Sequence, residues 1–179
     1  MPMTQSVLAE KTHEDVNQPK RICFICTGNT CRSPMAEAVA NAWAYKEIES
    51  LPSACRDLAT PSLEAFSAGL CANEGAPIAA HAVSALETAG IIALPSRDYR
   101  LHTAHTLTEQ DATEYDLLIA LTREHAMALL FRFPQLAQRI TVFPTDIPDP
   151  FGGSAEDYRI CLERIMQGVC DMLFAGESK

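Results

Sequence analysis

One stretch of nine residues, Cys26–Pro34, has the residue types and spacing needed for chemistry on a phosphoryl group. It reads Cys-Thr-Gly-Asn-Thr-Cys-Arg-Ser-Pro and follows a short apolar run, 21–26. The thiolate of Cys26 can attack phosphorus and form a covalent phosphocysteine. Arg32, six residues later, can hold two phosphoryl oxygens with its planar guanidinium, a geometry that lysine lacks. Ser33 is close enough in sequence to donate a hydrogen bond to the Cys26 sulfur.

The place of this stretch between a strand and a helix strengthens the interpretation. A loop that enters a helix presents unpaired backbone N–H groups, and the helix dipole adds to their attraction for anions. Gly28 lets the backbone turn tightly and approach a ligand without a side chain in the way. Together with a nearby arginine, these groups favour the reactive thiolate form of Cys26. A Cys-x5-Arg spacing alone is weak evidence in a chain with seven cysteines, and the alternative is a buried strand-end cysteine beside a surface arginine.

Hydrolysis also requires an acid for the leaving group and a base for the attacking water. The candidate is Asp149, which precedes Pro150 and Phe151 in a turn-rich segment, 144–153. The proline biases Asp149 away from helical backbone, so its carboxylate can reach over the site from a loop. An Asp-Pro turn without a catalytic role explains the spacing equally well. Asp146 is the nearby rival for the same task.

The rest of the chain alternates between short apolar runs, which predict strands, and apolar residues three or four apart, which predict helices. Such alternation predicts an α/β fold with a parallel sheet between helices. Ligands bind beyond the carboxyl ends of the strands in these sheets, which is where the Cys26–Pro34 stretch begins. The expected strands cover 21–26, 64–68, 116–121 and 139–143; the expected helices cover 34–48, 77–89, 108–114, 122–133 and 154–173, with a polar extended loop at 95–106.

Composition narrows the classes of function. The 179 residues suffice for a single domain, expected over 20–179, behind a flexible leader at 1–19. A net charge of −9 argues against nucleic acid as a partner, because that binding depends on neutralising phosphates. We expect neither a signal peptide nor a membrane anchor, and the odd, sparse set of cysteines fits a reducing cytoplasm. No zinc-type Cys/His spacing is found, so we expect no metal and no cofactor, and a monomer is the default expectation.

Residues 26–37, which end in Met-Ala-Glu, and residues 149–154, Asp-Pro-Phe-Gly-Gly-Ser, closely resemble the low-molecular-weight protein-tyrosine-phosphatase family. The resemblance extends from Arg21 to the last helix. It implies a three-layer fold with a four-stranded parallel sheet in the order 2-1-3-4 and helices on both faces. It also implies Cys26 as nucleophile, Arg32 as phosphoryl binder and Asp149 as general acid and base. The other implied residues are the phosphate-binding loop, Thr27, Gly28, Asn29, Thr30, Cys31 and Ser33, and the residues that brace it, Asn29, Ser33, Ser67 and His105.

Within this family the chain is most similar to the bacterial protein arginine phosphatases. That branch carries threonine at the position of Thr30, where tyrosine-specific relatives usually carry an aliphatic side chain. A hydroxyl there suits a polar, nitrogen-linked phosphate. Phe151 points the same way, because tyrosine-specific members more often have tyrosine after Asp-Pro. The resemblance therefore implies phosphorylated proteins as substrates, with phosphoarginine favoured and phosphotyrosine as the alternative.

Two other functions use similar residues. Related arsenate reductases use the same loop but need further cysteines on a later segment, and 72–160 contains none. A phosphoryl-carrier module would hold the phosphoryl group on cysteine and pass it on, and it would not need Arg32 or Asp149. Both alternatives therefore rank below a phosphatase.

Two cysteine pairs raise the question of redox chemistry. Cys31 resembles the family's neighbour of the nucleophile, which can form a reversible protective disulfide, and an inert loop cysteine is an equal alternative. Cys23 and Cys26 have the spacing of a dithiol motif, but they lie within one strand. Positions three apart in a strand face opposite sides of the sheet, so this second pair is rejected.

Overall fold

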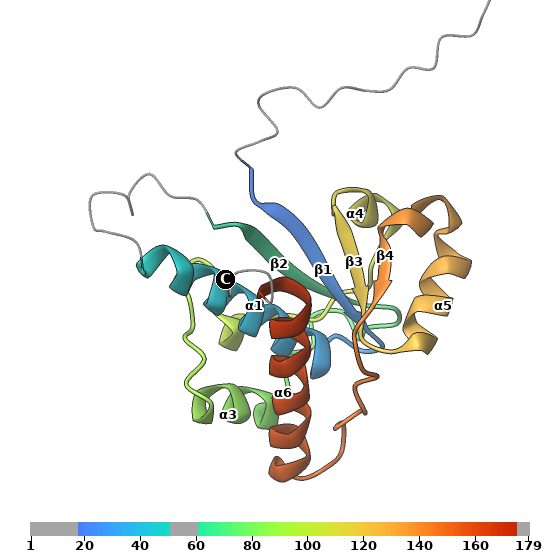
Figure 1. Ribbon diagram of the computed structural model, residues 1–179. Helices are drawn as coiled ribbons and strands as arrows, with labels where there is room; N and C mark the ends of the chain where they lie inside the picture. Colours follow the sequence, from blue (N-terminus) through green and yellow to red (C-terminus); the bar gives the residue numbers. More distant parts are fainter. Residues whose placement is uncertain (1–17, 51–60, 175–179) are drawn as a thin grey trace, which may run out of the picture.

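The computed structural model describes residues 18–50 and 61–174. The expected leader, 1–19, therefore lies almost wholly outside the described residues. Within the two described ranges, none of the helices has both the length and the apolar character that crossing a membrane requires. Strands and helices alternate along the chain (Figure 1). The strands are β1 (Lys20–Cys26), β2 (Leu63–Gly69), β3 (Leu117–Ala120) and β4 (Ile140–Val142); the helices are α1 (Arg32–Glu49), α3 (Ala80–Thr88), α4 (Glu109–Thr113), α5 (Arg123–Arg132) and α6 (Ala155–Val169).

The four strands are parallel and lie in the order β2-β1-β3-β4, which confirms the predicted sheet. β1 has a neighbour on each side, so that Phe24 pairs with Ser67 of β2 and with Ile119 of β3. Cys26 and Gly69, the last residues of β1 and β2, are paired at the carboxyl ends of these strands. This edge of the sheet is where ligands bind in such folds.

Helices cover both faces of the sheet (Figure 1). The helices α1, α3 and α6 pack on the face that holds Phe24, whereas α4 and α5 pack on the face that holds Ile25. β1 is buried on both faces, as expected for a central strand in three layers. Cys23 and Cys26 belong to opposite faces, which agrees with treating them as unrelated thiols.

The helix α1 begins at Arg32, two residues earlier than predicted, so that Ser33 lies in its first turn. Cys31 precedes the helix, and its side chain makes no capping hydrogen bond to the helix backbone. The first amides of α1 consequently face the carboxyl edge of the sheet without a side-chain cap, which suits an anion.

The helix α3 begins at Ala80 rather than at 77. Pro77 forms an antiparallel bridge with Thr103, and the Ala79 N–H donates to the Thr30 carbonyl at 2.8 Å. These contacts hold the chain extended for three residues before the helix. They also tie this segment to the loop that follows β1.

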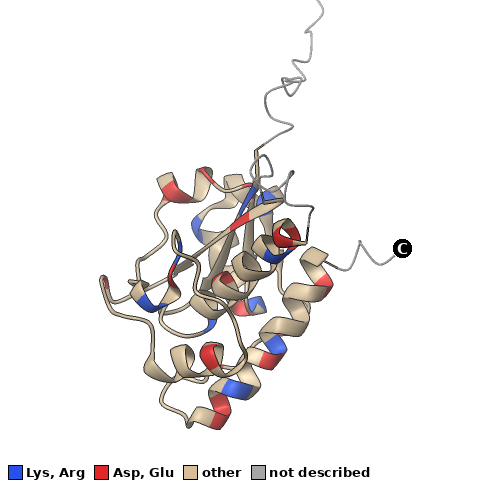
Figure 2. Cartoon of the chain, turned by 90° about the vertical axis from the view of Figure 1, so that its left-hand side faces the viewer, with Lys and Arg blue, Asp and Glu red and all other residues tan. Residues whose placement is uncertain are grey.

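The helix α6 begins with a capping box. The Ser154 hydroxyl accepts from the Asp157 N–H at 3.3 Å, and the Asp157 carboxylate accepts from the Ser154 N–H at 2.7 Å. The outer face of α6, the helix leading to the C-terminus in Figure 2, carries both signs of charge, and Arg159 pairs there with glutamates one turn away on either side. A π-helical turn, Cys170–Phe174, continues it to about the predicted end. The buried residues of its inner face include Tyr158, Leu162, Ile165 and Val169.

Gly168 provides a test of how closely α6 packs on the sheet. A Cβ at this position would overlap Cε1 of Phe143, whose ring packs edge-to-face against Phe24. We expect Gly168→Ala to lower the free energy of unfolding by about 1–3 kcal/mol, because a buried ring must shift. This loss opposes the roughly 1 kcal/mol that alanine adds as a better helix former. Urea denaturation measures the change, and Gln167→Ala on the exposed face is the control. If Gly168→Ala proves as stable as the wild type, the close packing of α6 against Phe143 is wrong.

Candidate active site

Cys26 ends β1 and is 2% exposed, beneath the loop that leads into α1. The Ser33 hydroxyl lies 2.9 Å from the Cys26 sulfur, and the Asn29 N–H donates to the same sulfur at 3.3 Å. Both groups can donate to a negatively charged sulfur, and hydrogen bonds to charged acceptors are stronger than neutral ones. The structure therefore brings together three residues that the sequence placed in one loop.

Asn29, rather than Gly28, makes the tight turn of this loop. Asn29 has a φ of 54°, a left-handed conformation that asparagine tolerates better than most residues, whereas Gly28 is not left-handed. A Cβ at Gly28 would meet nothing closer than Thr30 Oγ1, at 3.9 Å. The prediction that Gly28 is needed for the turn is therefore wrong. Gly28 lines the pocket described below, so its lack of a side chain leaves room for a ligand.

The side-chain amide of Asn29 connects the loop to the surrounding segments by hydrogen bonds. Its Nδ2 donates to Ser33 Oγ and to Ser67 Oγ, both at 3.0 Å. Its Oδ1 accepts from the backbone N–H of His105 at 3.0 Å. Because Ser33 belongs to α1 and Ser67 to β2, this single amide joins the loop to a helix, a strand and the segment before α4.

The histidine ring that contacts the loop belongs to His102, not to the predicted His105. His102 Nε2 lies 2.9 Å from the carbonyl oxygen of Asn29, whereas His105 reaches Asn29 through its backbone. A carbonyl oxygen can only accept, so Nε2 carries the hydrogen and donates. Burial lowers the pKa of His102, which keeps its ring neutral near pH 7. The two histidines are three residues apart in an irregular segment, where no periodicity indicates which ring turns inward.

A close approach of two loops completes the support. A Cβ at Gly69 would lie 2.7 Å from the Thr27 carbonyl oxygen, so only glycine fits there without a shift of the backbone. The Leu70 N–H donates to the Cys26 carbonyl at 2.9 Å, and the Cys71 N–H donates to the Thr27 carbonyl at 3.0 Å. The end of β2 therefore supports the first residues of the loop through its backbone.

Arg32 is buried and contacts Asp149. One terminal nitrogen of Arg32 donates to Asp149 Oδ2 at 2.7 Å, and the other donates to the Ile147 carbonyl at 3.3 Å. The Nε–H of Arg32 is buried and has no acceptor among the described residues. The rival carboxylate, Asp146, accepts instead from the Arg123 N–H at the start of α5, at 3.0 Å. The structure thus places Asp149, and not Asp146, beside the arginine of the loop.

The loop opens into a pocket of about 360 Å³. Thr30 is part of its lining. Phe151 is 75% exposed, so its ring is available to a substrate. The lining consists of the loop residues Cys26–Arg32 together with Cys71, Asn73, Ala76, Asp149 and Phe151.

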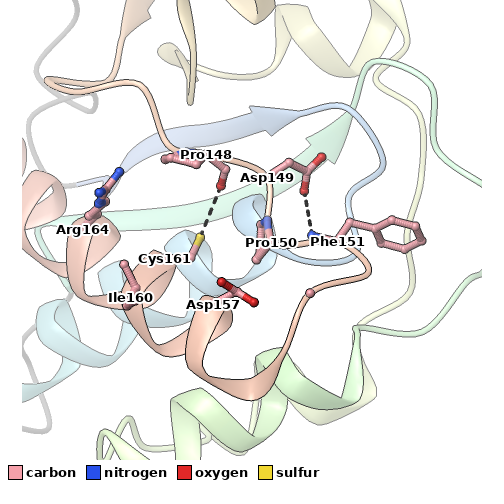
Figure 3. A pocket seen from close by; sticks show the side chains of 9 residues that line it. Pro148, Asp149, Pro150, Phe151, Asp157, Ile160, Cys161 and Arg164 are labelled. Carbon is pink, nitrogen blue, oxygen red and sulfur yellow. Dashed lines mark hydrogen bonds between the residues drawn. The ribbon is translucent and has the colours of Figure 1, made fainter.

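Asp149 and Phe151 also line a second hollow, of about 210 Å³, between their segment and α6 (Figure 3). Cys161 of α6 lies 3.8 Å from the Pro148 carbonyl, and burial raises the pKa of its thiol to about 12. Asp149 Oδ1 accepts from the Phe151 N–H at 3.2 Å (Figure 3). One oxygen of Asp149 is thus bound by its own segment, while the other is bound by Arg32.

His125 is a supporting residue that sequence reasoning missed. Its Nε2 lies 3.0 Å from Thr27 Oγ1, and its Nδ1 lies 3.0 Å from Thr122 Oγ1. Burial, and secondly the nearby Arg32, lower the pKa of His125. The Thr-x-x-His spacing indicates only a helix start; that this helix reaches the loop depends on the sheet order.

The surroundings of Cys31 favour an unreactive thiol. Its sulfur lies 3.2 Å from the Tyr158 hydroxyl and 3.6 Å from Thr30 Oγ1. Burial raises the pKa of Cys31, which favours the less reactive thiol. Cys26 and Cys31 are both free here, so their pairing stays a hypothesis. Tyr158, expected in the core, is buried.

Glu37 is a second residue that the sequence did not single out. The Ser67 hydroxyl donates to Glu37 Oε2 at 2.6 Å. Burial raises the pKa of Glu37 to about 7, against the opposing effects of the Ser67 hydrogen bond and of Arg97. Its place on α1 alone gave no sign that its carboxylate turns toward the sheet.

Together these groups form a site for a tetrahedral anion beside a thiol. The unpaired Nε–H of Arg32 and the uncapped start of α1 lie at the loop, and the Asp149 carboxylate lies next to Arg32. Among residues 18–50 and 61–174, no three His, Cys, Asp or Glu side chains lie together in a way that could hold a metal ion.

Comparisons with known proteins identify the family of this chain. Residues 21–177 match the family described as low molecular weight phosphotyrosine protein phosphatase. A protein-arginine-phosphatase of Geobacillus stearothermophilus is 33% identical over 154 residues, which cover 82% of this chain and 89% of that protein.

Two solved structures share the fold. The low molecular weight protein tyrosine phosphatase from T. tengcongensis is 32% identical, with a TM-score of 0.67, over 84% of this chain and 95% of its own. A mutant of the YwlE arginine phosphatase whose active site serine is phosphorylated is 29% identical, with a TM-score of 0.68, over 83% of this chain and 90% of its own. The chain therefore belongs to the low molecular weight phosphotyrosine protein phosphatase family and is an enzyme of the protein phosphatase class.

Proposed function

We propose that this enzyme hydrolyses phosphorylated protein side chains through a phosphocysteine on Cys26. The observation that carries the proposal is the unsatisfied donor of Arg32, a buried Nε–H without an acceptor among the described residues, in the same loop as the thiol. Leaving a buried donor unpaired costs about 1–3 kcal/mol. A phosphoryl oxygen held in the loop would remove that cost. Arg32 would then clamp the group that Cys26 attacks.

In the first step the Cys26 sulfur attacks phosphorus, the S–P bond forms, and the bond from phosphorus to the substrate's oxygen or nitrogen breaks. Asp149 donates a proton to the leaving atom. In the second step Asp149 accepts a proton from water, the water oxygen attacks phosphorus, and the S–P bond breaks to give inorganic phosphate. The hydroxyl of Ser33, 2.9 Å from the sulfur, stabilises the departing thiolate.

The relative with a phosphorylated active site serine supports this route. In that protein a residue of the active site itself carries the phosphoryl group. The serine stands at a mutated position, and phosphorylation there is the outcome expected when an oxygen nucleophile accepts a phosphoryl group that it releases poorly. Cys26 is the residue of this chain placed to accept such a group, because it lies beneath the loop beside Ser33 and Arg32.

We propose phosphoarginine as the favoured substrate and phosphotyrosine as the alternative. The Geobacillus relative named for arginine supports the first, and the T. tengcongensis relative named for tyrosine supports the second. The pocket supports arginine, because Thr30 and Asn73 add polar groups to its lining and Phe151 is its single aromatic side chain. A guanidinium leaving group can also pair with the Asp149 carboxylate, which a phenol cannot.

The mechanism suits a reducing compartment such as the cytoplasm, because only a reduced Cys26 is nucleophilic. We keep a monomer as the expected state, because Cys26, Arg32 and Asp149 approach one another within one chain. Phosphorylated proteins would be the partners.

Removal of the two reacting groups tests the mechanism. We expect Cys26→Ser to lower kcat on a phosphoarginine peptide by at least about 10³-fold, because an alcohol is a much poorer nucleophile and leaving group than a thiolate. We expect Asp149→Asn to lower kcat by about 10²- to 10⁴-fold, the usual contribution of a general acid. Steady-state phosphate release measures both. Asp146→Asn is the matched control and should stay near wild type; turnover that survives Cys26→Ser would refute the phosphocysteine route.

Substitution of Thr30 tests the substrate. The ratio of kcat/KM for phosphoarginine and phosphotyrosine peptides of the same sequence measures the preference. We expect this ratio to favour phosphoarginine in the wild type and to fall about tenfold or more in Thr30→Ile, because the variant replaces a polar contact with an aliphatic one. Thr30→Ser keeps the hydroxyl and should keep the preference. A wild type that prefers phosphotyrosine would retain the mechanism and overturn the choice of substrate.

A further inference from the structure

Glu37 is placed behind the site without contacting the reacting groups. It lies on α1, its carboxylate accepts from Ser67, and it is absent from the lining of the thiol pocket. It instead lines a separate hollow of about 340 Å³, together with Arg97, Asp98 and His102. The mechanism above uses none of these contacts. The contact by which Glu37 can influence the site is its hydrogen bond with Ser67.

The hydrogen bonds between Glu37 and Cys26 form a chain with a defined direction. Asn29 Oδ1 accepts from the His105 N–H, which settles which end of the amide carries the hydrogens. Each of the two Nδ2 hydrogens goes to one serine oxygen, that of Ser33 or that of Ser67. Both serine oxygens are therefore acceptors toward Asn29, and each hydroxyl has one hydrogen left to donate.

These two hydroxyl hydrogens are available at opposite ends of the series of hydrogen bonds. The Ser67 hydroxyl donates to Glu37 Oε2 at 2.6 Å, and the Ser33 hydroxyl can donate to the Cys26 sulfur, 2.9 Å away, when that sulfur is a thiolate. Without an acceptor at position 37, the Ser67 hydroxyl would be free to turn its hydrogen toward Asn29, where two donors would oppose each other. A displaced Asn29 amide would then no longer hold Ser33 as a donor to sulfur.

We propose that Glu37 is a positioning residue for Cys26, which fixes the direction of the chain Glu37–Ser67–Asn29–Ser33–Cys26 and so keeps the Ser33 hydroxyl donating to the thiolate. The proposal rests on the proposed function, because it concerns how the same thiol is kept ready. Linked hydrogen bonds of this kind polarise one another, so an anionic acceptor at one end strengthens the donor at the other.

The protonation state of Glu37 gives the proposal a pH dependence. Burial raises its pKa to about 7, so the carboxyl is neutral well below this value and ionised well above it. A neutral carboxyl can turn its own O–H toward Ser67, which removes the fixed direction of the chain. The contribution of Glu37 to activity is therefore lost as the pH falls through about 7 and is complete above it.

The charged and titratable groups that face Glu37 lie across the hollow and on β1. Across the hollow, Arg97 contacts Glu64, Asp98 is bound by Arg100, and burial lowers the pKa of His102. The pKa of Cys23, on the β1 side, is raised chiefly by burial and secondly by Glu37. Burial therefore favours a neutral His102 ring and a protonated Cys23, while Arg97 and Asp98 are paired with opposite charges.

The test compares three variants by two readouts. We expect Glu37→Leu, which removes the acceptor, to lower kcat/KM on a phosphopeptide at pH 8 and to slow alkylation of Cys26 by iodoacetamide, each about tenfold. This is the effect of losing one hydrogen bond to a charged group. Glu37→Gln keeps an acceptor without a titration, so it should stay within about threefold of wild type at pH 8 and lose the limb of the pH profile near pH 7. Glu37→Leu combined with Ser67→Ala should be no worse than Ser67→Ala alone, because Glu37 acts through Ser67.

Each readout can also overturn the proposal. Additive losses in the double variant, wild-type alkylation in Glu37→Leu, or an unchanged pH profile in Glu37→Gln would each contradict it. Urea denaturation of all variants separates loss of folding from loss of positioning, and Glu37→Gln remains decisive if Glu37→Leu does not fold. Alkylation of Cys26 needs no substrate, so it tests the chain even where the enzyme turns over no phosphopeptide and the proposed function fails.

Discussion

The site depends on the side-chain amide of Asn29. Each of its polar hydrogens and its oxygen has a partner, and the partners come from α1, from β2 and from the segment before α4. An amide cannot exchange its oxygen and nitrogen without opposing donors to donors, so this arrangement has one orientation. The same residue takes the strained left-handed φ that turns its backbone N–H toward the sulfur. Because a partly satisfied buried network is costly, loss of one of these hydrogen bonds weakens the support of the whole loop.

The order of the strands explains how the Asn29 amide can contact three separate segments. β1 and β2 are adjacent and parallel, so their carboxyl ends bring Cys26 and the Ser67–Gly69 turn to the same edge of the sheet. β3 lies on the other side of β1, and α5 follows it directly, which brings His125 against Thr27. The loop is therefore contacted by residues of β2 on one side of β1, and by a residue of α5, which follows β3, on the other side. A change of strand order would separate them even if every element kept its own structure.

The sequence predicted those features that depend on local pattern. The strand before Cys26, the four-stranded order and the last helix were predicted and are present. The choice of Asp149 over Asp146 agrees with the contact to Arg32 in the structure. These signals lie in consecutive residues, or in a resemblance that spans the domain.

The missed features depend on contacts between distant segments. His102 rather than His105 reaches the loop because Pro77 and Thr103 pair across an irregular region, and this pairing has no periodic signal in the sequence. Glu37 occupies an ordinary helical position, and its burial follows from how α1 packs on β2. For Gly28 the residue was assigned to the right loop with the wrong physical reason, since the turn belongs to its neighbour.

The ion pair between Arg32 and Asp149 has a consequence for what the resting enzyme holds. Arg32, the one arginine that is buried among residues 18–50 and 61–174, is already paired with a carboxylate of the same chain, within a molecule of net charge −9. The two terminal nitrogens of Arg32 contact Asp149 and the Ile147 carbonyl, whereas its Nε–H is left for a further acceptor. An anion that accepts from this Nε–H need not displace Asp149, but one that is held by both terminal nitrogens must compete with the carboxylate. The carboxylate of the same chain therefore weakens the binding of any free anion that engages the terminal nitrogens of Arg32.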